Sequence, residues 1–276
     1  DIWPNIIEDL KFAYDNLPAI QQQKGRLNKW AAGAMLAKAY LFQHDYQNAK
    51  MVFDQVILQG ETSRGVKYSL ASQFEDNFLP KKEATNPEAV FQIEMAANVD
   101  GDSFWHANPG DLLNFPYNGP FTCCGFYQPT QDLVNHYRTN PVTGLPYVDD
   151  YNQYPVKSDM GILSDSPFTP DQGTLDPRLD WTVGRRGIPY LDWGNHPGRY
   201  WIVDQPSAGP YSSKKNVWWQ VNDAEDHDPG GSGTGTAINL LVIRFADVLL
   251  MTAECEAQLD NLDKAEEYVN AVRARA

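Results

Sequence analysis

Aromatic and polar side chains gather in two segments that contain few residues favouring regular structure. Residues 103–117 hold Trp105, Asn108, Phe115 and Tyr117, and residues 190–200 hold Tyr190, Asp192, Trp193, Asn195 and Arg199. A sugar ring presents apolar C–H faces and hydroxyl edges, so a glycan site needs aromatic platforms beside hydrogen-bonding side chains. These nine residues are therefore the candidates for stacking on a sugar ring and for hydrogen bonding to its hydroxyls.

Trp193 is the strongest candidate platform. Its neighbours Asp192, Gly194, Asn195 and Pro197 are poor helix and strand formers, so they favour a loop that carries the ring. Trp105 is the next candidate. The alternative for each tryptophan is that it fills a core beneath a long loop, because large rings are usually substantially buried. Sequence alone leaves both interpretations open.

Carboxylates could instead hold a metal or carry out catalysis. Asp223, Asp226 and Asp228 precede a glycine-rich run and could bind Ca²⁺, but their spacing does not match an EF-hand and a solvated acidic loop is the commoner explanation. No metal or cofactor is assigned. The sequence shows no metal-ligand spacing of histidines, nucleophile elbow or phosphate-binding loop, so we predict that the chain is not an enzyme. A glycosidase carboxylate pair stays an alternative.

Charge and hydropathy exclude two kinds of partner. The 276 residues carry a formal charge of −14, whereas nucleic-acid binding draws on clustered Lys and Arg. No stretch approaches the length of apolar chain that crosses a bilayer. The negative charge also disfavours anionic polysaccharides. A local basic patch remains an alternative, from Arg185, Arg186, Arg199, Lys214 and Lys215.

Helical periodicity is strongest at the two ends of the chain. Apolar residues recur every three or four positions over 2–17, 27–43 and 46–58, and the segment after residue 240 behaves alike. Small residues twelve positions apart accompany both ends, Ala37 with Ala49 and Ala253 with Ala265. This spacing is typical of tetratricopeptide-like helical hairpins. The predicted fold is mainly α-helical.

The middle of the chain differs from both ends. We predict one domain in which 1–60 and 238–276 form a helical scaffold and 61–237 forms a loop-rich, glycan-binding region. Within that region we expect a strand over 89–95, a short helix over 130–137 and a strand over 200–203. Because the chain begins at Asp1 without a signal peptide and residues 269–276 continue in helical register, we expect it to lack both ends of a longer protein.

Ordered motifs along the whole chain resemble the SusD/RagB family. Near the start these are IEDL at 7–10, NLP at 16–18 and GRL at 25–27; in the middle NPEAVF at 86–91, PTQDLV at 129–134 and DPRL at 176–179. Near the end they are IRFADVLLM at 243–251, AE at 253–254, YVN at 268–270 and VRARA at 272–276. The C-terminal set resembles the family's signature helix pair.

The resemblance implies more than the residues do alone. It implies a SusD-like α–α superhelix, a lipid-anchored place on the outer-membrane cell surface, capture of oligosaccharide or polysaccharide, and delivery to a SusC-type TonB-dependent transporter. An alternative function is a helical-repeat scaffold that binds another protein.

Overall fold

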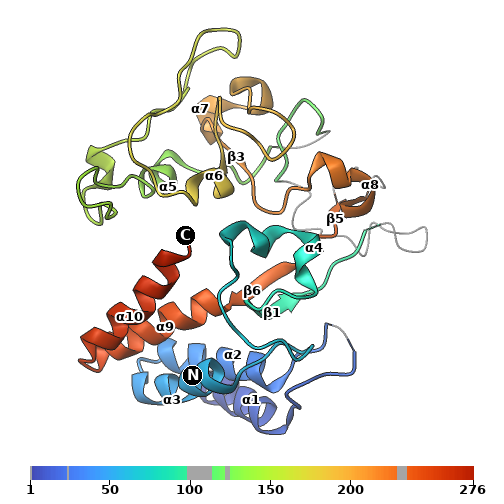
Figure 1. Ribbon diagram of the computed structural model, residues 1–276, viewed down its shortest axis with the longest axis vertical. Helices are drawn as coiled ribbons and strands as arrows, with labels where there is room; N and C mark the ends of the chain where they lie inside the picture. Colours follow the sequence, from blue (N-terminus) through green and yellow to red (C-terminus); the bar gives the residue numbers. More distant parts are fainter. Residues whose placement is uncertain (1, 24, 98–113, 122–124, 229–234) are drawn as a thin grey trace. The chain divides into compact units, whose positions relative to one another are not determined.

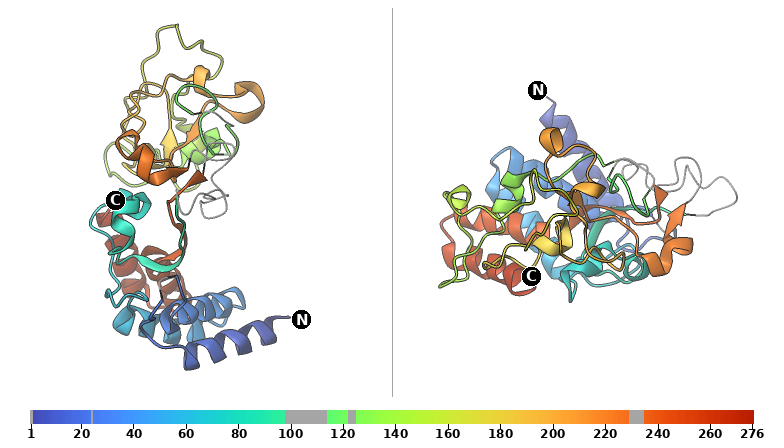
Figure 2. Two further views of the ribbon diagram at one scale, coloured as in Figure 1. Left: turned by 90° about the vertical axis from the view of Figure 1, so that its right-hand side faces the viewer. Right: turned by 90° about the horizontal axis from the view of Figure 1, so that it is seen from above.

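The computed structural model describes residues 2–23, 25–97, 114–121, 125–228 and 235–276. The chain divides into two compact units, the first containing Asp1–Glu94 with Asn239–Ala276 and the second containing Met95–Ile238 (Figures 1 and 2). Ten α-helical segments and a few strands of two to five residues make up the regular structure of the described chain. The prediction of a mainly helical fold is confirmed.

Five longer helices dominate the first unit, and the first three match the predicted ranges to within about two residues. They are α1 Trp3–Asn16, α2 Lys29–Phe42, α3 Tyr46–Gln59, α9 Phe245–Gln258 and α10 Leu262–Ala274. Asn28 caps α2, since its side chain accepts a hydrogen bond from the Ala31 N–H. Its amide also donates to the carbonyls of Ala19 and Glu61, so one side chain fixes three segments.

Small residues allow these helices to pack closely. Ala37 and Ala49 are fully buried, and Ala253 and Ala265 are buried on the second helix pair. Helix α2 contacts α1, α3 and α9, and α10 contacts α9 (Figure 1). The two predicted hairpins therefore exist and share one hydrophobic core. Within the described residues, each helix is too short or too polar to cross a bilayer.

A two-stranded antiparallel sheet closes the first unit. Strand β1, Ala89–Ile93, pairs with β6, Leu240–Arg244, which leads directly into α9. The 3-10 helix η1, Phe74–Phe78, and helix α4, Pro80–Glu83, precede β1. We predicted that the loop-rich region begins at residue 61, but the first unit extends to Glu94 because this strand pairing joins 61–94 to the helices.

Glu88 lies at the centre of a buried ionic network in the first unit. Its side chain is fully buried and lies 2.5 Å from Arg275 Nη1 and 3.3 Å from Arg244 Nη1. The Ala71 N–H and the Asn77 amide also donate to Glu88 Oε2. Two arginines of the C-terminal segment are thus fixed to the residue just before β1, which links the NPEAVF motif with the C-terminal motifs.

The described part of the second unit consists mostly of turns and loops that join short elements. These are α5 Gln131–Asn135, η4 Tyr151–Gln153, α6 Leu179–Thr182, β2 Val183–Gly184, η5 Arg199–Trp201, α7 Gln205–Ala208, β3 Ser212–Ser213, η6 Gln220–Asn222, α8 Asp223–Asp226, β4 His227–Asp228 and β5 Gly235–Thr236. Strands β2 and β3 pair, as do β4 and β5. Thr130 caps α5, which confirms the short helix predicted there.

The strand predicted over 200–203 is wrong. Residues 199–201 form the 3-10 helix η5 instead. The cause is Gly198, whose φ of 78° lies in a region that glycine adopts without steric cost and that breaks an extended path.

Candidate functional site

A buried aromatic cluster supports the loops of the second unit. It contains Phe115, Phe121, Tyr190, Trp201, Val217 and Trp218, with Trp193 packed against its edge. The Phe121 ring lies near the centre, 5.6 Å from Trp201 and 5.4 Å from Trp218 between ring centroids. Edge-to-face pairs of this kind are favourable in addition to the area that they bury. Three segments distant in sequence are therefore held together by their rings.

Backbone hydrogen bonds join these segments as well. The Tyr117 N–H donates to the Trp201 carbonyl at 3.0 Å, and the Asn118 amide donates to the Tyr200 carbonyl at 2.9 Å. The Gly125 N–H donates to the Phe115 carbonyl at 2.8 Å. A β-carbon on Gly125 would lie 3.2 Å from Tyr117 Cβ and 3.5 Å from Val203 Cβ. Residues 114–118, 125–127 and 199–203 are thus adjacent.

Four large rings on these adjacent segments are exposed to solvent. The exposed fraction is 44% for Tyr117, 57% for Tyr200, 52% for Phe126 and 69% for Tyr127. We call these four residues the aromatic surface. Exposed aromatic groups that stand on a rigid base are typical of binding sites, because they form contact area with little loss of side-chain freedom. The side chain of Arg199, the residue before Tyr200, is also exposed.

The structure gives the Trp193 loop a partly structural role. Trp193 is only partly buried, and its indole N–H donates to the Trp218 carbonyl at 3.0 Å. The Asp192 carboxylate accepts from the N–H groups of Gln220 and Val221 at 2.7 and 2.9 Å. Asp192 therefore holds this loop against residues 220–221. Asn195 is exposed, as a hydroxyl-binding residue requires.

Two of the predicted platforms are wrong. Tyr190 and Phe115 are fully buried, so neither offers a ring face to a ligand. The Tyr190 hydroxyl donates to the Ser213 carbonyl, and burial raises the pKa of this phenol. Both residues sit in segments rich in polar residues, a composition that does not distinguish a buried ring from a platform. Trp105 and Asn108, also predicted, lie outside the described residues.

His196 fixes the turn that leads into η5. It is buried, its Nδ1 accepts from the Gly198 N–H at 3.0 Å, and its Nε2–H therefore donates to Ser212 Oγ at 2.9 Å. Burial lowers the pKa of His196 to about 3, so the ring is neutral at physiological pH. This role of His196 could not be predicted from sequence, because a single histidine in a loop has many uses.

A buried carboxylate lies beside the same turn. Asp159 is almost fully buried and its Oδ2 is 4.0 Å from Arg186 Nη1. Burial raises the pKa of Asp159. A β-carbon at position 198 would lie 2.3 Å from Asp159 Oδ2, so glycine is the residue that fits here. Tyr200 thus follows a turn fixed by Gly198, His196 and Asp159.

The acidic segment contributes to folding in the described structure. Asp223 Oδ1 accepts from the Trp218 indole N–H at 2.5 Å and lies 2.9 Å from His227 Nδ1. Among the residues whose side chains the structure describes, which do not include Asp228, no three potential metal ligands lie close enough together to hold an ion. Ca²⁺ binding here remains a prediction from sequence.

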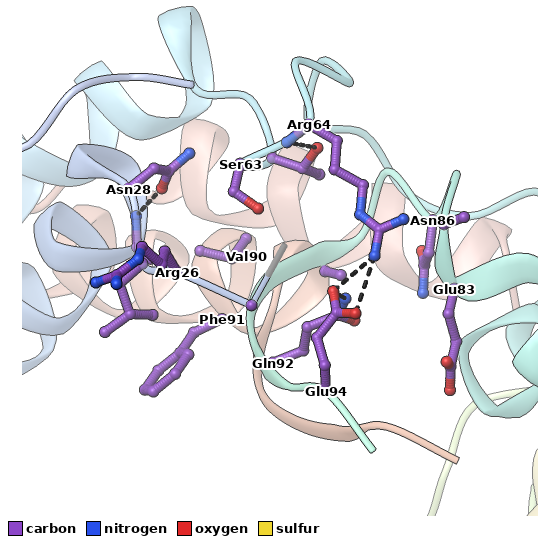
Figure 3. Close-up of a pocket in the computed structure, with 16 residues that line it drawn as sticks. Arg26, Asn28, Ser63, Arg64, Glu83, Asn86, Val90, Phe91, Gln92 and Glu94 are labelled. Atoms are coloured by element: carbon purple, nitrogen blue, oxygen red, sulfur yellow. Dashed lines mark hydrogen bonds and ion pairs between the residues drawn. The ribbon is translucent and has the colours of Figure 1, made fainter. Parts of the chain in front are cut away.

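The first unit has a pocket of its own, shown in Figure 3, but it is too small for a sugar. Arg64 Nη2 reaches both Glu94 carboxylate oxygens, at 2.8 and 2.9 Å, and Gln92 lies beside them (Figure 3). The cavity measures about 30 Å³. That volume suits about one water molecule. The pocket at Arg64 is therefore not a candidate glycan site.

Comparison with known proteins identifies the family. The model of the SusD family matches residues 87–276, which is well over half of the chain. The chain belongs to the SusD family. This SusD-family chain is 26% identical to SusD-like protein P25 of Formosa agariphila. The match covers the whole of this chain and 47% of P25. The chain therefore spans about half the length of the curated relatives that it matches.

Solved structures confirm the SusD-like fold. A SusD superfamily protein from Bacteroides vulgatus matches all of the chain with a TM-score of 0.66 and 24% identity, over 49% of its own length. Surface glycan-binding protein A from Bacteroides thetaiotaomicron, solved with laminarihexaose, matches all of the chain with a TM-score of 0.61 and 17% identity, over 54% of its own length. At these identities the likeness establishes the fold and not the ligand.

Proposed function

We propose that this SusD-family chain binds an oligosaccharide or polysaccharide on the aromatic surface of its second unit. The observation that carries the proposal is the exposure of Tyr117, Phe126, Tyr127 and Tyr200 on adjacent segments that a buried aromatic cluster supports. Sugar C–H faces stack on such rings, while the exposed side chains of Asn195 and Arg199 are suited to hydroxyl groups.

The proposed binding is reversible, and the contributions of the stacked rings to the binding free energy add together. Each stacked ring contributes on the order of 1 kcal/mol, so several rings must act together to give useful affinity. The supporting loops are fixed before the ligand arrives, by the Phe121-centred cluster and by the hydrogen bonds of Tyr117 and Asn118. A fixed surface loses little conformational freedom on binding. We propose binding and not catalysis as the role of this chain.

Relatives support the class of ligand. A laminarin-binding SusD-like protein and the laminarihexaose complex of surface glycan-binding protein A share the fold, with TM-scores of 0.55 and 0.61. Both ligands are glycans. Because identity to each is below 25%, these structures support a carbohydrate ligand for this chain without indicating which one.

The whole protein would act at the cell surface. From the family we propose a lipid anchor in the outer membrane and delivery of the captured glycan to a SusC-type TonB-dependent transporter. The first unit offers apolar side chains that suit a protein contact: Phe12, Phe42 and Leu58 are 69%, 57% and 70% exposed on its helices. Protein docking by the first unit and glycan capture by the second are compatible functions.

Affinity electrophoresis tests glycan binding directly. The purified chain is run through native gels that each contain one polysaccharide, and the polymer is afterwards checked for cleavage products. Slower migration in at least one gel, with no cleavage, is the expected result. A folded chain that migrates normally through every gel would contradict the proposal, and released sugar would show an enzyme.

A further inference from the structure

We infer that the ligand of the aromatic surface is a neutral glycan and not a sulfated or uronic acid polysaccharide. This inference rests on the proposed glycan binding and adds the ligand's chemical class. Polyanions are recognised by clusters of exposed Arg and Lys that pair with sulfate or carboxylate groups. The question is therefore where the cations of the second unit lie.

Residues 95–238 are strongly acidic. They contain eight Lys and Arg against seventeen Asp and Glu, a formal charge of −9. The negative charge of this unit repels polyanions over about one screening length, which is about 8 Å at physiological ionic strength. Only a local group of cations could reverse this repulsion at the site.

Three cations of the candidate basic patch are buried. Arg185, Arg186 and Lys214 are 7%, 8% and 6% exposed. Arg185 pairs with Asp180 at 2.6 Å, and Arg186 donates to the carbonyls of Ser164 and Ser166. The Lys214 ammonium donates to the carbonyls of Asp180 and Pro189, and burial lowers its pKa to about 8. These cations hold the fold together and do not face a ligand.

Other cations of the unit have intramolecular partners too. Arg138 pairs with Asp171 at 2.6 Å, and Arg178 pairs with Asp176 at 2.5 Å. The Lys157 ammonium donates to the Thr169 carbonyl at 2.7 Å. Each would have to break a contact to bind an anionic group.

Arg199 is the cation that lies on a segment of the aromatic surface. It is exposed, but Asp204 is also exposed five residues later. One exposed guanidinium in an acidic unit pairs weakly with an anion in water. A neutral sugar needs no cluster of cations, because the rings bind its C–H faces and single polar side chains bind its hydroxyls. Ring stacking without a basic cluster therefore selects neutral polymers.

Matched polymers test this inference. Laminarin, starch and galactomannan are each compared with a chemically sulfated sample of the same polymer, by affinity electrophoresis at 20 and 300 mM NaCl. We expect retardation by at least one neutral polymer at both salt concentrations, and at least tenfold weaker binding of its sulfated form. Equal or tighter binding of a sulfated form, weakening as NaCl rises, would overturn the inference but preserve glycan binding. No binding of any polymer would refute glycan binding itself.

A charge variant gives a second, independent result. Val203 is exposed next to Gly125 and Tyr117, so Val203→Lys places a cation at the surface, and Val203→Ala is its matched control. We expect Val203→Lys to bind the sulfated polymer at least threefold tighter than Val203→Ala does, with neutral binding nearly equal. If Val203→Lys binds the sulfated polymer no more tightly than Val203→Ala does, electrostatic repulsion and the lack of a local cation do not explain the exclusion of polyanions.

Discussion

The backbone N–H of Tyr117 donates to the carbonyl of Trp201 at 3.0 Å, across more than eighty residues of sequence. This bond places Tyr117 beside the segment that carries Tyr200, and the Asn118 amide reinforces it through the Tyr200 carbonyl. Two exposed rings that neither segment could orient alone become neighbours on a fixed base.

Gly119→Ala should destabilise the second unit and distort this base. Gly119 has a φ of 81°, and an added β-carbon would lie 2.2 Å from the Trp201 indole nitrogen. The strained backbone and the clash together should lower the free energy of unfolding by about 2 to 4 kcal/mol. Gly144→Ala is the matched control, because Gly144 also has a positive φ, of 70°, but a β-carbon added there would meet no other atom within 4 Å. Denaturant titration measures both variants; equal losses would show that Trp201 does not constrain position 119.

Glu88→Gln should be the most damaging of the ionic substitutions in the first unit. It leaves Arg275 and Arg244 facing a neutral amide inside the protein, and breaking a buried pair costs about 3 to 5 kcal/mol. Glu94→Gln breaks the partly exposed pair with Arg64 and should cost about 1 kcal/mol or less. Chemical denaturation followed by circular dichroism compares them. A Glu94→Gln loss as large as that of Glu88→Gln would contradict this ranking.

Acid should destabilise the second unit through His196. The pKa of His196 is about 3 in the folded chain and about 6.5 in the unfolded chain, so between these values the unfolded state binds the extra proton. The contribution of His196 to the free energy of unfolding is therefore largest above pH 6.5 and falls as the pH drops, by about 3 kcal/mol at pH 4.5. The hydrogen bond from Arg138 helps to lower the pKa of Asp171 to about 2. Protonation of Asp171 therefore reduces the stability of the folded chain further below pH 3.8.

Urea denaturation between pH 7.5 and 4.5 measures this effect. His196→Gln removes the titrating ring while keeping hydrogen-bonding atoms, so its stability should depend less on pH over this range. A wild-type stability that is constant from pH 6.5 to 4.5 would show that His196 is accessible to protons in the folded chain.

The helices could be predicted from sequence because their signals are local. Apolar periodicity gave α1, α2 and α3 to within about two residues, and the paired alanines indicated which helices pack closely. The same local reasoning failed at 200–203, since Gly198 forms a turn there that packs closely against Asp159, which is distant in sequence. Contacts between residues distant in sequence leave no local pattern.

The site was harder to predict for the same reason. Composition singled out the segments that carry these rings, but it could not tell the buried rings of Tyr190 and Phe115 from the exposed rings of Tyr117 and Tyr200. Which ring faces the core depends on the cluster around Phe121, which three separate segments build. Phe126 and Tyr127 were missed because no polar sugar-binding pattern surrounds them.

The most direct test of glycan binding is isothermal titration of the Tyr117→Ala/Tyr200→Ala double variant with the polysaccharide that retards the wild-type chain. Tyr154→Ala is the control, because Tyr154 is as exposed as Tyr117 but lies outside the aromatic surface. At about 1 kcal/mol per ring, the double variant should bind roughly thirtyfold more weakly while Tyr154→Ala binds normally. A double variant that folds and binds as tightly as the wild type would show that the glycan does not stack on this surface.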